Sequence, residues 1–218
     1  FDIAKTADMN LKLPEIQNGK PEMIICEKSP EQELQTDAGI ERARRIEAKT
    51  VQPDEDNMLA VCTYMTKVAL DARIIDPEAE EYDGGKVALC AEKIIEINKA
   101  NPGTAQAVFC DTNTPKKDAF SVYQALRDRL VRSGEFTENE IAFVHDAAND
   151  KQRLAMFEKV NNAEIKIIIG STGKLGTGVN IQRKLSALHH LDAPYRPSDI
   201  EQRNGRGIRQ GNENSEVY

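Results

Sequence analysis

Residues 165–169 read Ile-Lys-Ile-Ile-Ile and lead directly into a glycine-rich segment, residues 170–178. A short β-branched run bounded by turn residues is typical of a strand that is buried on both faces of a parallel sheet. Neighbouring parallel strands are joined by long crossover connections, which are usually helices. The run therefore predicts an α/β chain in which strands and helices alternate.

The preceding segments supply this alternation. Residues 105–110 form an apolar run that ends in the polar turn 111–115, and residues 141–145 form a second apolar run. Between these runs, four apolar residues recur at helical spacing: Phe120, Tyr123, Leu126 and Leu130. Asn149 is placed to cap a further helix, which carries Leu154, Phe157 and Val160. Strand, helix, strand, helix and strand in this order predict a right-handed, doubly wound parallel sheet.

The first 83 residues differ in composition from the rest of the chain. They contain 10 Lys and Arg against 19 Asp and Glu, whereas residues 84–218 contain 19 against 17. Ser29 and Pro30 predict the start of a helix that runs to about residue 49. An apolar stripe, more typical of core packing than of a ligand site, predicts a second helix: Met58, Val61, Cys62, Met65, Val68 and Ala72. We therefore expect a helical extension and linker over residues 1–83 and an α/β domain over residues 84–218.

A segment near residue 200 carries three arginines. Ser198 and Glu201 have the spacing of a capping box, which predicts a helix that starts at about residue 199. At 100° per residue, three side chains lie on one face of this helix: Gln202, Arg206 and Arg209. Guanidinium groups bind phosphate oxygens bidentately and keep their charge, so this face suits a polyphosphate. A solvated basic helix is the alternative interpretation.

The glycines of these segments argue against two common nucleotide-binding loops. A Walker A loop needs four residues between its glycines and a Ser or Thr after its lysine, but here Leu175 follows Lys174. A dinucleotide fingerprint needs a third glycine where Ile181 stands. Gly205 and Gly207 would each cost about 1 kcal/mol in a helix interior. They predict a helix that ends early or a backbone that packs very closely.

Residues 202–209, Gln-Arg-Asn-Gly-Arg-Gly-Ile-Arg, resemble motif VI of superfamily-2 helicases, His/Gln-Arg-x-Gly-Arg-x-x-Arg, at every fixed position. Residues 171–180 resemble motif V, residues 105–115 resemble motif IV, and residues 187–192 read as the buried strand between motifs V and VI. Residues 188–212 are similar to the helicase part of large bacterial and phage proteins that combine a Swi/Snf-like helicase with a DNA methyltransferase. The resemblance implies a RecA-like parallel sheet flanked by helices, the C-terminal lobe of such a helicase, with an N-terminal helical extension.

The resemblance also implies roles in ATP hydrolysis. Arg209 is the candidate arginine finger, and Arg206 would share the γ-phosphate. Arg203 is expected to hold an acidic partner across the interface between two lobes. Three further positions correspond to contacts with phosphate and ribose: Gln202, Asn180 and Gly178. ATP and Mg²⁺ would be bound mainly by a missing N-terminal RecA-like lobe, because this sequence contains neither a Walker A motif nor an acidic box. The isolated lobe is expected to be inactive.

The second lobe of this family contacts the backbone of one DNA strand. The resemblance places five residues at that contact: Thr172, Thr112, Asn113, Lys116 and Lys117. For the two lysines, an ordinary solvated loop is the alternative. No aromatic residue is placed to stack on bases, so we expect contacts to the DNA backbone without readout of the sequence. The net charge of −7 predicts weak affinity of this piece for DNA.

Three functions remain open at this stage. The first is the second motor lobe of a DNA-dependent ATPase that translocates on DNA or remodels it, in a protein that could also carry a fused methyltransferase. The second is a non-catalytic RecA-like docking module within a methyltransferase–helicase protein, although such a module has no need of the arginine face. The third is a phosphate-ligand binder that uses the glycine turn alone, and it predicts tight nucleotide binding by this chain.

The remaining residues add few constraints. Four cysteines without a Cys-x-x-Cys pair indicate reduced, buried thiols in a cytoplasmic protein, and His189-His190 are expected in a core or interface role. The three histidines offer no metal set, and no signal peptide or apolar stretch of membrane length is present. The sequence begins without a methionine and stops where a further strand starts near Val217. We therefore expect it to be a fragment of a longer protein.

Overall fold

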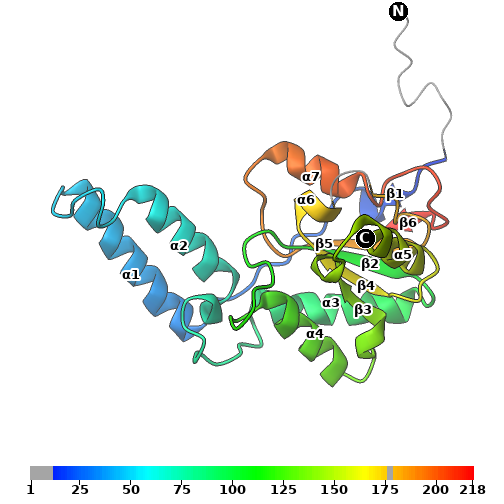
Figure 1. The fold of residues 1–218 in the computed structure, drawn as a ribbon, viewed down its shortest axis with the longest axis horizontal. Coiled ribbons are helices and arrows are strands. Elements are labelled where there is room, and N and C mark those ends of the chain that lie inside the picture. Colours follow the sequence, from blue (N-terminus) through cyan, green and yellow to red (C-terminus); the bar gives the residue numbers. More distant parts are fainter. Residues whose placement is uncertain (1–11, 176–178) are drawn as a thin grey trace, which may run out of the picture.

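The computed structural model describes residues 12–175 and 179–218. Its central sheet has four parallel strands in the order β3–β4–β2–β5 (Figure 1). These are β2 (Ala105–Phe109), β3 (Ile141–Phe143), β4 (Ile167–Gly170) and β5 (Leu185–His190). The parallel α/β sheet is as predicted. β3 is shorter than predicted because the chain turns into a short 3₁₀ helix at Val144–Asp146, and β5 begins two residues earlier than predicted.

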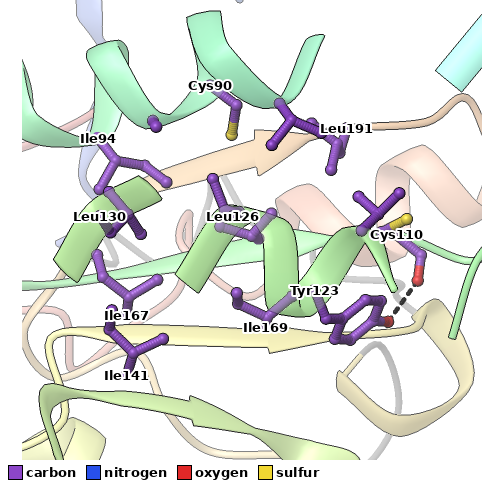
Figure 2. Packing of buried hydrophobic residues seen from close by; sticks show 14 of the residues in the cluster. Cys90, Ile94, Cys110, Tyr123, Leu126, Leu130, Ile141, Ile167, Ile169 and Leu191 are labelled. Carbon is purple, nitrogen blue, oxygen red and sulfur yellow. Dashed lines mark hydrogen bonds between the residues drawn. The ribbon is translucent and has the colours of Figure 1, made fainter. Parts of the chain in front are cut away.

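Helices cover both faces of this sheet. On one face, α3 (Lys86–Ala100) and α4 (Val122–Arg132) pack against every second residue of the strands, including Val108, Ile167 and Ile169. Figure 2 shows Cys90 and Ile94 of α3 and Leu126 and Leu130 of α4 in this layer. On the other face, α5 (Asp150–Asn161) contributes Phe157 and Val160 to a second cluster with Ala107 and Ile168. Both faces are apolar, which explains the continuous β-branched run in β4.

The helix starts follow their sequence signals. The Ser29 hydroxyl accepts a hydrogen bond from the Gln32 amide at 3.1 Å, and the Gln32 side chain accepts one from the Ser29 amide at 3.0 Å. This capping box begins α1 (Pro30–Glu47). Asn149 caps α5 by accepting a hydrogen bond from the Gln152 amide at 3.0 Å, as predicted.

The helices α1 and α2 (Met58–Leu70) form a hairpin that projects from the sheet and its covering helices (Figure 1). The predicted apolar stripe is only partly core. Val61 and Val68 are buried, and Leu70 packs into the cluster under α3 and α4, but Met58 and Cys62 are exposed. α2 ends at Leu70, and the last residue of the stripe, Ala72, begins a short 3₁₀ helix, Ala72–Ile74. Among the described residues, none of the helices combines the length and the apolar composition that crossing a membrane requires.

Two short strands form a second sheet beside the central one. β1 (Glu15–Ile16) pairs in parallel with β6 (Glu216–Val217), the strand predicted near Val217. Tyr218 joins this pair to the edge of the main sheet, because its amide donates to the Ser186 carbonyl at 2.9 Å and its carbonyl accepts from the Leu188 amide at 3.0 Å. β1 itself was not predicted. The domain boundary between residues 83 and 84 stays a prediction.

Candidate functional site

The carboxyl ends of the central strands bring polar residues from distant parts of the sequence together. Asp111 follows β2, Thr172 follows β4, and Asp192 follows β5. Above them lie the single turn α6 (Thr172–Leu175) and α7 (Pro197–Asn204), which carries Arg203 (Figure 1). The carboxyl ends of parallel strands are the usual place for a ligand in open α/β sheets.

Arg203 is fully buried at the centre of this group. Its Nη2 donates to Asp111 Oδ2 at 2.8 Å and to Asp192 Oδ1 at 3.2 Å, and its Nε donates to Thr172 Oγ1 at 2.8 Å. Its Nη1 donates to the Asp192 carbonyl at 2.9 Å, and the guanidinium carbon lies 5.3 Å from the centre of the Phe109 ring. A buried charge is tolerated only when it is paired and hydrogen-bonded in this way.

These partners differ from the sequence expectation, which placed an acidic partner of Arg203 across an interface between lobes. Asp111 and Asp192 belong to the same lobe, 92 and 11 residues away in the sequence. The reason is the strand order: β2 lies between β4 and β5, so Asp111, two residues after β2, lies within reach of Arg203 on α7.

The two carboxylates also fix the loops that follow β2 and β4. Asp192 Oδ2 accepts hydrogen bonds from the Asp111 amide at 2.7 Å, the Thr112 amide at 2.7 Å and the Thr112 hydroxyl at 2.8 Å. Asp111 accepts from the Thr172 amide and from the Thr172 hydroxyl, each at 2.6 Å. Burial opposes ionisation of Asp111, but the hydrogen bonds from Thr172 and Arg203 outweigh it and hold the pKa of this carboxyl below its usual value.

Arg206 and Arg209 converge on one backbone carbonyl. Arg206 Nη1 donates to the Val179 carbonyl at 2.9 Å, and Arg209 Nη1 donates to the same oxygen at 3.2 Å. Burial lowers the pKa of Arg206 from its usual value, and the nearby charge of Arg209 lowers it further. Two guanidinium groups are therefore held side by side next to Asn180, which is exposed.

The sequence predicted that Arg206 and Arg209 lie on one face of a helix. The structure brings them together in a different way. α7 ends at Asn204, and Arg206 and Arg209 follow in turns. The predicted capping box is also absent: the helix begins at Pro197, which suits the first helical position and lacks an amide hydrogen, so Ser198 lies inside the first turn.

Both predictions for the glycines are confirmed. Gly205 ends α7, and a Cβ on Gly207 would lie 3.0 Å from Leu188 Cδ1 and 3.0 Å from Val217 Cγ1. The backbone at Gly207 therefore packs closely against β5 and β6 at the edge of the sheet, and Arg206 and Arg209 on either side of it bind the Val179 carbonyl.

The remaining predicted site residues fall into three groups. Gln202 is exposed on α7, and Gly178 lies outside the described residues. Lys116 and Lys117 are exposed in the loop after β2, where neither makes a hydrogen bond or ion pair to another described residue. The Asn113 side chain accepts from the Val122 amide at 2.7 Å and donates to the Phe120 carbonyl at 3.3 Å, so it fixes the start of α4.

Asp111 and Asp192 were not predicted as functional residues. The available signal was weak: each is an acidic residue within two positions of the end of an apolar strand. His189 is half-buried and has a structural role, as predicted, whereas His190 is exposed, which differs from a role in the core. His189 Nε2 is bonded to Gln106 Oε1 at 2.8 Å, and His190 stacks on Phe109. Within residues 12–175 and 179–218, no group of three His, Cys, Asp or Glu residues is placed to hold a metal ion.

All four cysteines are free. Burial raises the pKa of the Cys90 thiol to about 12 and that of the Cys110 thiol to about 12, so neither is a reactive nucleophile. Cys62 is exposed on α2, which differs from the expectation of buried thiols.

Residues 86–211 match the model of the family described as the helicase conserved C-terminal domain. Over 152 residues, the chain is 29% identical to the "Defense against restriction protein B" of Escherichia phage P1. The match covers 66% of this chain and 7% of the phage protein, so the chain spans a small part of that relative's length.

Solved structures share the fold. The C-terminal domain of the Sulfolobus solfataricus SWI2/SNF2 ATPase superposes with a TM-score of 0.57 at 19% identity, covering 78% of this chain and 70% of that one. The C-terminal part of the Fun30 ATPase domain gives 0.67 at 13% identity, covering 95% and 84%. The Sulfolobus solfataricus ATPase core in complex with double-stranded DNA gives 0.63 at 19% identity, covering 88% and 38%. At these identities the likeness is one of fold.

Proposed function

This chain belongs to the helicase conserved C-terminal domain family, and from that premise we propose that it is the second motor lobe of a Swi/Snf-like, DNA-dependent ATPase. In this role Arg209 is the arginine finger and Arg206 shares the γ-phosphate of ATP. The lobe works with an N-terminal RecA-like lobe of the same protein, which supplies the phosphate loop and the groups that hold Mg²⁺. A fused DNA methyltransferase is a further proposed part of the protein.

The convergence of Arg206 and Arg209 on the Val179 carbonyl supports this proposal most strongly. Two like charges close together repel each other, and a half-buried site screens that repulsion less than water does. No carboxylate of a described residue lies within ion-pair distance of Arg209. A polyphosphate brought in by the partner lobe supplies several anionic oxygens and relieves the repulsion. The two planar forks suit such oxygens better than lysines would.

The neighbouring residues fit the same ligand. Asn180 follows Val179, whose carbonyl both arginines bind, and Gln202 lies four residues before Arg206. Both amide side chains are exposed and offer donors for phosphate or ribose oxygens. When bound, ATP supplies the phosphoryl group whose transfer to water releases energy. The residues of this chain contribute positive charge at the γ-phosphate, while Arg203 holds the segment that carries them against the sheet.

The test is ATP hydrolysis by the full-length protein, with and without duplex DNA. We expect DNA to stimulate the wild type and Arg209→Ala to reduce turnover by about a thousandfold, because arginine fingers contribute that much to transition-state stabilisation. Arg209→Lys keeps the charge but loses the fork, so we expect only partial rescue. The matched control is Arg44→Ala on the projecting hairpin, where the arginine side chain is 72% exposed.

Normal hydrolysis by Arg209→Ala, at unchanged thermal stability and DNA affinity, would remove the catalytic assignment. The docking-module function would then take its place. If DNA does not stimulate the wild type, the DNA-dependent motor is not the function of this protein.

A further inference from the structure

We infer that Ser171 and Lys174 bind the DNA backbone at the carboxyl edge of the sheet, and that Thr112 and Thr172 position the two loops there without contacting DNA. The inference rests on the proposed function, since it assigns the contacts of the same DNA-binding edge. It changes the sequence expectation, which gave both threonines a direct contact.

Thr172 has no donor left for a phosphate. A threonine offers two donors, its amide and its hydroxyl, and a phosphate oxygen only accepts. The Thr172 amide donates to Asp111 Oδ1 and the hydroxyl donates to Asp111 Oδ2, each at 2.6 Å. The hydroxyl oxygen also accepts from Arg203 Nε at 2.8 Å, and the residue is only 9% exposed. A carboxylate already occupies the place that a phosphate would need.

Thr112 is committed in the same way. Its amide and its hydroxyl both donate to Asp192 Oδ2, at 2.7 Å and 2.8 Å. Asp192 is 6% exposed and also accepts from Arg203, so it is held in place. Releasing Thr112 would leave the buried Asp192 carboxylate with fewer partners, and releasing Thr172 would leave Asp111 and the buried Arg203 with fewer partners, which costs free energy in each case. Both threonines therefore hold their loops to the framework.

The residues next to Thr172 have donors to spare. In the described part of the chain, neither the Ser171 hydroxyl nor the Lys174 ammonium has a hydrogen-bond or ion-pair partner, and Lys174 is exposed. The Ser171 carbonyl accepts from the Lys174 amide at 3.0 Å and from the Leu175 amide at 2.8 Å. Residues three apart in one helical turn lie on the same side, so Ser171 and Lys174 present a hydroxyl and a cation together.

Leu175 anchors the backbone of this turn in the core. Leu175 is completely buried and packs in the cluster beneath α6 with Val144 and Val179. Lys174 lies close enough to the end of β3 to act on His145, whose pKa is lowered by burial and further by the lysine charge. The anchored backbone therefore fixes the place from which Ser171 and Lys174 present their side chains.

Electrostatics favours the same assignment. The Asp111 side chain is 36% exposed beside Thr172, so its negative charge repels a phosphate placed over that threonine. Lys174, two residues further on, and the exposed Lys116 and Lys117 carry the positive charge of this edge. The backbone of one DNA strand is therefore expected to follow the lysines and Ser171 and to avoid the carboxylate.

The experiment measures binding of the full-length protein to a fluorescein-labelled duplex by anisotropy, over a series of salt concentrations. Each phosphate contact contributes about 0.9 to the slope of log K against log salt. We expect Lys174→Ala to reduce that slope by about 0.9 with no change in thermal midpoint, and Lys174→Arg to retain the wild-type slope. Ser171→Ala weakens binding with an unchanged slope. The charge-matched control is Lys99→Ala at the opposite edge of the sheet, where the lysine side chain is 59% exposed and the slope should not change.

A second pair of variants tests the threonine. Thr172→Ser keeps both donors and should bind DNA like the wild type. Thr172→Val should lower the thermal midpoint, yet show the wild-type salt slope at temperatures where it is folded. A wild-type slope in Lys174→Ala, or weakened binding by folded Thr172→Val with normal binding by Lys174→Ala, would overturn this inference alone. A wild type that binds no duplex DNA would overturn the proposed function, and this inference with it.

Discussion

At the scale of single residues, Arg203 shows how one side chain can hold a site together from within. Its guanidinium binds residues that follow three different strands, and every contact forms only when β2, β4 and β5 are side by side. The motif in the sequence marks Arg203 as part of the arginine segment. It does not distinguish a buried arginine from a ligand-binding one, because both need the same fork of donors.

The residue that this arrangement depends on most is Asp192. We expect Asp192→Asn to lower the free energy of unfolding by about 3 kcal/mol, because an amide cannot replace a buried carboxylate that pairs with Arg203 and accepts three further hydrogen bonds. Urea unfolding measures the change. Asp83→Asn is the matched control: the Asp83 side chain is 87% exposed, and its ion pair with Arg129 should contribute less than about 1 kcal/mol. Equal effects of both substitutions would contradict the assigned role.

At the scale of elements, β5 begins with apolar residues and ends with His189 and His190, and His189 links the strand to its neighbours. Gln106 Nε2 donates to the Ile94 carbonyl at 2.9 Å, so its Oε1 is free to accept, and His189 Nε2 must carry the proton. The strand therefore joins α3 through one amide side chain. Sequence alone predicted the strand and a structural role for His189, but not its partner Gln106 on β2.

The His189 environment predicts a pH dependence of stability. Burial, then the nearby His190 and Lys93, lower the pKa of His189 from 6.5 to about 3. As the pH falls, His189 takes up a proton at a higher pH in the unfolded chain than in the folded chain. The contribution of neutral His189 to the free energy of unfolding is therefore complete above about pH 6.5 and is lost as the pH falls towards 3. Between about pH 6 and pH 5, we expect the free energy of unfolding to fall by roughly 1 kcal/mol per pH unit from this group. His189→Gln keeps a donor and should flatten that slope in urea titrations, whereas an unchanged slope would contradict the prediction.

At the scale of the whole molecule, the two ends of the described chain meet. β1 pairs with β6, and Tyr218 joins β6 to β5, so the segment before the hairpin lies along the segment that follows the arginines. Val217 of β6 is buried, is paired in register with Ile16 of β1, and has its side chain next to Gly207. The residues that precede the hairpin therefore help to hold the arginine segment on the sheet edge.

Removal of residues 1–19 tests this arrangement. We expect the chain that lacks them to be less stable by on the order of 1–3 kcal/mol of unfolding free energy, because the hydrogen bonds between β1 and β6 are lost and Val217 loses its neighbour Ile16. Hydrogen exchange of residues 207–218 should become faster, while exchange in β2 and β4 should change little. Unaltered protection of residues 207–218 would show that β1 is not needed there.

The sequence by itself determined the alternation of strands and helices, the parallel sheet and the identity of the arginine motif. These follow from local patterns: β-branched runs for strands covered on both faces, apolar residues at helical spacing, and fixed residue types at fixed offsets. Only the tertiary structure decided that Arg203 faces Asp111 and Asp192, that Arg206 and Arg209 meet at Val179 after α7 has ended, and that β1 joins β6. Such contacts join residues up to about 200 positions apart through short polar segments that have no periodicity, so the strand order must be known before they can be seen.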